Sequence, residues 1–60
     1  MNELINQIKE TANAIVCNAE LQSEKGNKAA GLRARRASLD IEPMLKRFRK
    51  ISLEAAKSAE

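Results

Sequence analysis

The side chains best suited to chemistry in this sequence are positively charged and concentrate in its second half. Residues 27–60 contain nine Lys or Arg against four Asp or Glu, a net charge of +5, whereas residues 1–26 contain two against four, a net charge of −2. Five of the nine are Arg, whose planar guanidinium matches the oxygens of a phosphate group. The chemistry that this half offers is recognition of a polyanion.

Residue types for catalysis or metal binding are scarce by comparison. The sequence contains no His and a single cysteine, Cys17, which excludes a disulfide framework and the usual zinc sites. Cys17 also has no His to activate it as a nucleophile. The carboxylates are isolated or spaced for ion pairs, and no glycine-rich phosphate loop is present. We therefore expect a protein that is not an enzyme, without cofactor, metal ion or small-molecule substrate.

Helices must position the basic side chains, because Ala, Leu, Ile, Glu, Lys and Arg dominate the composition and aromatic residues are nearly absent. Gly26 suits the left-handed position that follows a helix, and Asn27 is a strong N-cap for the next helix. The fold class is therefore predicted to be all-α, an antiparallel two-helix hairpin. Its helices are expected over about 2–24 and 28–58, joined by a turn over 25–27.

Both predicted helices carry an apolar stripe with alternating spacings of four and three residues. The stripe of the first helix is Met1, Ile5, Ile8, Ala12, Ile15 and Ala19, with Leu4 and Val16 beside it. The stripe of the second helix is Ala30, Ala34, Ala37, Ile41, Met44, Phe48, Ile51 and Ala55. One hairpin of this size leaves much of both stripes uncovered, so we predict a homodimer or higher homo-oligomer, most simply a four-helix bundle. The residues expected in core and dimer contacts are Ile5, Ile8, Ile15, Ile41, Met44, Phe48 and Ile51.

Pro43 lies inside the second predicted helix, where it removes a hydrogen bond and clashes with the preceding turn. The helix either breaks near Ile41 and restarts, or bends and continues. The apolar phase runs through Ile41 and Met44 to Phe48 without slipping, and Pro43 lies on the solvent side. This pattern favours one continuous helix that bends at Pro43.

The polyanion surface is expected on the basic helix, away from its apolar stripe. No aromatic residue interleaves the charges, so stacking on single-stranded bases is not supported. No helix-turn-helix spacing is present, which predicts phosphate contacts with little base reading. A merely solvated helix face is the competing interpretation. The expected binding residues are Lys25, Lys28, Arg33, Arg35, Arg36, Lys46, Arg47, Arg49, Lys50 and Lys57.

Two minor apolar strips lie outside the main stripes. Ala14, Cys17 and Leu21 form one strip, on the first helix. Leu32, Leu39 and Leu53 form the other, at multiples of seven residues, with Lys46 at the remaining position. The strip on the first helix is either scattered surface, which is common, or a contact between protomers. The leucines of the other strip either rest under Lys and Arg stems or belong to a dimer contact together with Leu21, and the contact is favoured near the turn. The sequence contains no secretory leader and no long apolar run, so we expect a cytoplasmic protein without membrane contact.

The sequence resembles the bacterial linker-histone-like family first known from chlamydiae, as a short form without the long Lys-, Ala- and Pro-rich tail. The resemblance is carried by Glu24-Lys25-Gly26-Asn27-Lys28-Ala29-Ala30, Arg33-x-Arg35, Ser38, Phe48-Arg49-Lys50-x-Ser52 and Ala55. It implies a nucleoid-associated protein that binds and compacts double-stranded DNA through charge, with RNA as an alternative polyanion. The matching basic positions are Lys25, Lys28, Arg33, Arg35, Arg49 and Lys50. The alternative function is a small helical homo-oligomeric module that binds proteins through its exposed leucines.

Overall fold

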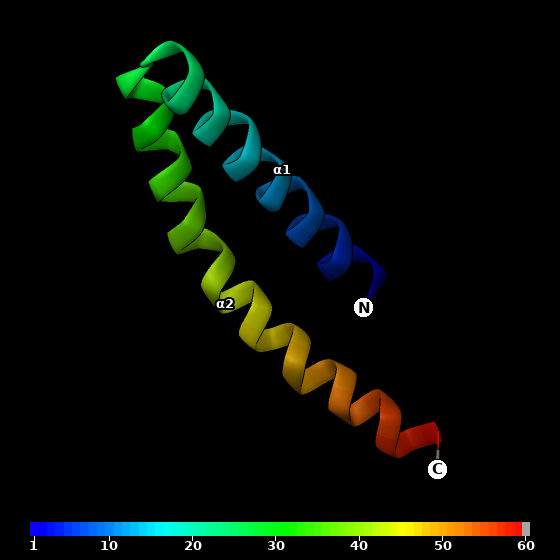
Figure 1. The fold of residues 1–60 in the computed structure, drawn as a ribbon. Coiled ribbons are helices and arrows are strands. Elements are labelled where there is room, and N and C mark those ends of the chain that lie inside the picture. Colours follow the sequence, from blue (N-terminus) through cyan, green and yellow to red (C-terminus); the bar gives the residue numbers. More distant parts are fainter. Residues whose placement is uncertain (60) are drawn as a thin grey trace.

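The computed structural model describes residues 1–59, which form two helices, α1 (Asn2–Lys25) and α2 (Lys28–Ala59). The helices run antiparallel and lie side by side, and α2 extends beyond the N-terminus of α1 (Figure 1). The molecule is a rod of 50 × 15 × 14 Å. Two helices and no strand over residues 1–59 confirm the prediction of an all-α chain.

A two-residue link reverses the chain between the helices. Gly26 has φ 63° and ψ 26°, in the left-handed region, and its N–H donates to the carbonyl of Gln22 at 3.0 Å. The N–H of Asn27 donates to the carbonyl of Leu21 at 3.3 Å, which completes a Schellman-type end to α1. The Oδ1 atom of Asn27 then accepts from the N–H of Ala30 at 3.0 Å and caps the start of α2.

Near the link the helix backbones approach closely because the facing residues are small. Ala30 and Ala34 of α2 are buried, and so is Gly31. The side-chain amide of Gln22 rests against Gly31, where an added Cβ would lie 2.5 Å from its Cδ. Farther from the link, the ribbons of α1 and α2 move apart (Figure 1), as larger side chains occupy the space between them.

The contact face of α1 differs from the predicted stripe by one position. Leu4 is only 5% exposed, whereas Met1 and Ile5 are 53% and 42% exposed. The side chains that meet α2 recur at Leu4, Ile8, Thr11, Ile15, Asn18 and Gln22. The predicted and observed stripes share Ile8 and Ile15. The spacing of apolar residues alone therefore could not show which of the two stripes contacts α2.

Two polar residues of α1, Thr11 and Asn18, face α2 because each finds a partner there and in its own helix. The hydroxyl of Thr11 donates to the carbonyl of Gln7 at 2.8 Å and lies 3.7 Å from Sδ of Met44. The Oδ1 atom of Asn18 accepts from Nε of Arg33 at 2.9 Å. These contacts rotate α1 so that Ile5 turns toward the solvent.

On α2 the side chains of Ala37, Ile41, Met44 and Ile51 are half-buried against α1, while Phe48 is 36% exposed. The helix continues through Pro43, whose side chain is exposed. Figure 1 shows α2 as one continuous, gently curved ribbon. Since proline has no N–H, the carbonyl four residues earlier, in Leu39, lacks its helical donor on the side that water can reach.

Candidate nucleic-acid interface

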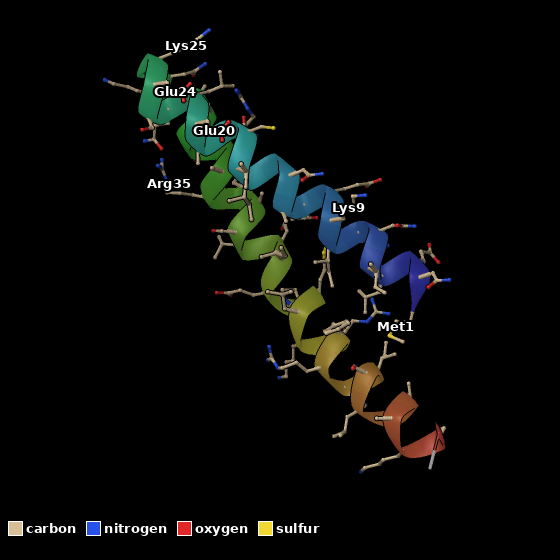
Figure 2. All side chains as sticks on the ribbon, turned by 45° about the vertical axis from the view of Figure 1, so that its right-hand side comes forward. Met1, Lys9, Glu20, Glu24, Lys25 and Arg35 are labelled. Carbon is tan, nitrogen blue, oxygen red and sulfur yellow. The ribbon has the colours of Figure 1, made fainter. Side chains whose placement is uncertain are left out.

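All ten basic residues expected to contact a polyanion are exposed, but the hairpin does not bring them onto one surface. Seven share the side of α2 that faces away from α1. Figure 2 shows one of them, Arg35, pointing away from the paired helices. The other three, Lys25, Arg33 and Arg47, lie at the end of α1 or along the seam between the helices.

The outer face of α2, as we define it, consists of three lines of residues at heptad spacing, which places each line along one side of the helix. The central line is Leu32, Leu39, Lys46 and Leu53. The two flanking lines are Lys28, Arg35 and Arg49 on one side and Arg36, Lys50 and Lys57 on the other. All ten side chains are exposed. Within residues 28–57, the only acidic residue on these lines is Glu42, between Arg35 and Arg49.

Arg33 does not belong to the outer face, since its Nε donates to Oδ1 of Asn18 at 2.9 Å and ties α2 to α1. The Nδ2 atom of Asn18 donates in turn to the carbonyl of Ala14 at 2.8 Å. Arg33 therefore keeps only the terminal nitrogens of its guanidinium free for a phosphate, and it contributes to the register of the hairpin.

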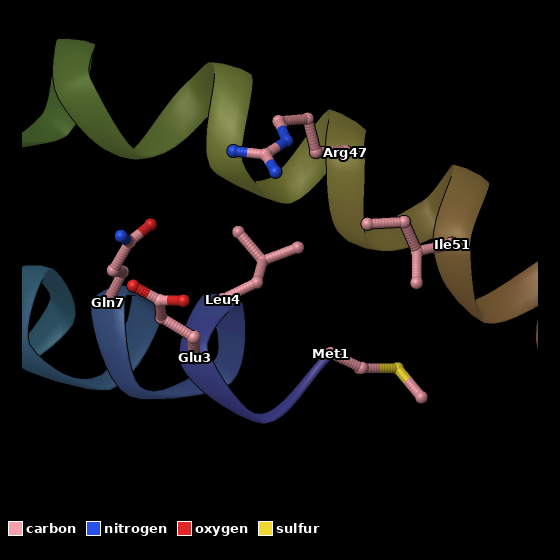
Figure 3. A pocket seen from close by; sticks show the side chains of 6 residues that line it. All are labelled: Met1, Glu3, Leu4, Gln7, Arg47 and Ile51. Carbon is pink, nitrogen blue, oxygen red and sulfur yellow. The ribbon is translucent and has the colours of Figure 1, made fainter.

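Arg47 lines a cleft of about 340 Å³ at the end of the hairpin opposite the link. Figure 3 shows its guanidinium extending from α2 over Leu4, with Glu3 and Gln7 on the facing helix. Arg47 therefore lies on the seam beside Glu3, at the N-terminal end of α1, and not on the outer face of α2. The sequence could not separate Arg33 and Arg47 from the other basic residues, because their placement depends on the packing of α1.

The face formed jointly by α1 and α2 carries an apolar groove. It has a volume of about 170 Å³ and is lined by Ile5, Ile8, Leu45 and Phe48. Ile5 and Phe48, which were expected in core or dimer contacts, are thus exposed at this groove rather than enclosed in the hairpin. Val16 is also exposed on α1.

The dimensions of α2 suit contact with a duplex. Its 32 residues give a rod of roughly 48 Å at 1.5 Å per residue, which exceeds one helical turn of B-DNA, about 34 Å. The exposed residues of its outer face include three Arg and four Lys and no aromatic side chain. Such a surface can donate hydrogen bonds to phosphates over this length, without stacking on bases.

Other kinds of site find no support in the described residues. No group of three or more His, Cys, Asp or Glu within residues 1–59 is arranged to hold a metal ion. Cys17 is an exposed free thiol on α1. Neither α1 nor α2 combines the length and the hydrophobicity that a helix needs to span a membrane.

Comparison with known protein families gave a match over nearly the whole chain. The family model described as histone H1-like protein Hc1 matches residues 2–58. Comparisons with curated proteins and with solved structures gave no match.

Proposed function

This chain belongs to the histone H1-like Hc1 family, and on that premise we propose that it binds double-stranded DNA in the bacterial nucleoid without sequence specificity. The observation that carries the proposal is the outer face of α2, where seven Lys or Arg side chains are exposed along one side of a single helix. Duplex DNA presents a continuous row of phosphates to such a face. The affinity of such a protein for DNA comes mainly from the counterions that are released when Lys and Arg neutralise the phosphates.

Compaction requires more than one DNA contact per particle. We propose that two hairpins pair through the apolar groove lined by Ile5, Ile8, Leu45 and Phe48. Pairing there covers side chains that the single hairpin leaves exposed and directs both outer faces of α2 away from the interface. The resulting four-helix homodimer carries two DNA-binding faces and can hold two duplexes together. RNA, which offers the same phosphates, is a competing ligand in this mechanism.

The first test is a titration of random-sequence duplex DNA at two salt concentrations. If about six phosphates are neutralised, affinity should fall on the order of a thousandfold between 50 and 200 mM salt. A second random duplex should bind equally well. A competition with RNA of equal length measures the preference between the two polymers. Absence of binding at low salt would contradict the proposed function.

Variants of the basic residues test whether the outer face of α2 is the DNA-binding surface. The triple variant Arg35→Ala/Arg49→Ala/Lys50→Ala should bind more weakly and with a shallower salt dependence, while circular dichroism shows that it stays helical. The matched control compares Arg35→Ala with Lys9→Ala, which removes one exposed charge from α1 instead. Equal losses from these two single variants would show that net charge alone, rather than the outer face of α2, governs affinity.

A protein-interaction module is the second candidate function, favoured by the exposure of Leu39 (66%) and Leu53 (59%) within the basic face. It predicts binding that depends on these leucines and responds little to salt. Replacing both leucines with Ser separates the candidates, because the phosphate contacts of the neighbouring Lys and Arg remain.

A further inference from the structure

The side of α1 that faces away from α2 has a pattern complementary to the outer face of α2. Glu10, Cys17 and Glu24 follow one another at heptad spacing, and Glu20 and Leu21 lie beside this line. All five side chains are exposed. We call these five residues the outer face of α1. It offers a short apolar strip, formed by Cys17 and Leu21, within an acidic surround.

The outer face of α2 has the same layout with the opposite charge. Leu32, Leu39 and Leu53 form an apolar line between two basic lines, and all three leucines are well exposed. On the outer face of α2, leucines are flanked by basic residues, and on the outer face of α1, apolar residues are flanked by acidic ones. Helices in a coiled coil pair through faces of this kind. Contact with phosphates explains the basic lines but gives no role to the leucines.

The register of the hairpin determines which residues would face each other in a neighbouring copy. Within one hairpin Thr11 lies level with Met44, and Gln22 with Gly31. A second hairpin placed alongside at the same height, with no rotation, brings its α1 antiparallel to the first α2. This placement sets Glu10 opposite Lys46. It also sets Cys17 opposite Leu39 and Glu24 opposite Leu32.

We propose that hairpins associate side by side, with the outer face of α1 in one copy docked on the outer face of α2 in the next. The two faces lie on opposite sides of each hairpin, so the contact is heterologous and forms an open row rather than a closed dimer. A contact between two helices buries a small area, which makes the association weak and sensitive to salt. It is independent of the apolar groove, and DNA competes with it for the outer face of α2.

Disulfide trapping tests this contact. In the Leu39→Cys variant, the introduced thiol should lie near Cys17 of a neighbouring copy, whereas the two thiols of one copy lie on opposite sides of the hairpin. Diamide treatment at low salt and without DNA should give a ladder of dimers, trimers and larger species on a non-reducing gel. The unmodified protein, with Cys17 alone, can give dimers at most. The Leu45→Cys variant places its second thiol at the apolar groove and should give no salt-sensitive ladder.

Charge reversal provides a test without added thiols. Sedimentation velocity should show loss of the larger species in Glu10→Lys and in Lys46→Glu, and their recovery in the double variant. No ladder in Leu39→Cys at low salt, or no recovery in the double variant, would overturn the inference. Random duplex DNA should suppress the ladder. DNA binding without a ladder would leave the proposed function standing and remove this contact, whereas a ladder without DNA binding would do the reverse.

Discussion

At the scale of single residues, the two glycines perform different tasks. Gly26 adopts φ 63°, and an added Cβ would meet no atom within 4 Å, so its conformation, not its size, matters. Gly31 is helical and buried, and only the movable side-chain amide of Gln22 occupies the space of a Cβ. Substitution by alanine should therefore lower stability at Gly26 but not at Gly31.

Gly26→Ala should destabilise the hairpin by about 1 kcal/mol, because an L-residue in the left-handed region clashes with its own backbone. For a chain of this length the melting temperature should fall by roughly 4–8 °C. Thermal unfolding followed by circular dichroism at one fixed protein concentration measures the change. An unchanged melting temperature would show that the left-handed link is not needed.

Gly31→Ala should leave stability unchanged or raise it by up to about 1 kcal/mol, since alanine is the better helix former. The Gln22 side chain has only to swing outward into solvent. The double variant Gln22→Ala/Gly31→Ala removes that neighbour and is the matched control. A loss of stability in both variants would mean that the helix backbones themselves, rather than Gln22, exclude a methyl group.

At the scale of the helices, the observed contact face of α1 predicts very different stability costs for substitutions at the neighbouring residues Leu4 and Ile5. Leu4→Ala should cost about 2–3 kcal/mol, because it removes a buried side chain that fills the space between α1 and α2. Ile5→Ala should cost much less in a dilute sample, because Ile5 is 42% exposed. Urea unfolding of both variants provides the comparison. Equal costs would indicate that α1 is rotated toward the stripe predicted from sequence.

Much of this fold could be predicted from sequence because its signals are local. Gly26 and Asn27 mark the link by their own backbone preferences, and the apolar phase of α2 crosses Pro43 without slipping. The observed contact face of α1 differs from the predicted stripe because it includes the polar residues Thr11 and Asn18. These two residues can face α2 only because they contact Met44 and Arg33 there. Spacing within one helix carries no information about such partners.

The candidate interface could also be predicted only in part from sequence. The basic character of residues 28–57 could be predicted from composition, and so could the exposure of Arg35 or Lys50. Separating Arg33 and Arg47 from the outer face required the packed hairpin, because both lie where α2 meets α1. The acidic line of Glu10, Cys17 and Glu24 was visible in the sequence at heptad spacing. Its value as a docking surface depends on the register that Thr11 and Met44 reveal.

At the scale of the whole molecule, charge is divided between the two long sides of the rod. The α1 side is acidic, so we expect it to repel a duplex and one hairpin to bind a single duplex. Bridging of two duplexes should therefore require pairing through the apolar groove. Phe48→Ser should retain binding to a single duplex but lose bridging, measured by pull-down of a labelled duplex on beads that carry an unlabelled one.

The control for bridging is Leu39→Ser, which leaves the apolar groove intact. It should bridge normally, because its side chain lies on the other side of α2. If Phe48→Ser bridges as well as the unmodified protein, then pairing through the groove is not the source of two-duplex binding.

The two-residue link at Gly26 and Asn27 also governs how the hairpin forms. Contacts between α1 and α2 nearest the link close the shortest loops, so they cost the least chain entropy and can form first. Contact order is correspondingly low, and helical proteins of this kind fold in microseconds to milliseconds. Amide protons around Ala30 and Ala34 should exchange most slowly with solvent, and those of residues 53–58, where α2 extends beyond α1 (Figure 1), fastest. A hairpin unfolded by heat or denaturant should accordingly regain its structure within about milliseconds once native conditions return.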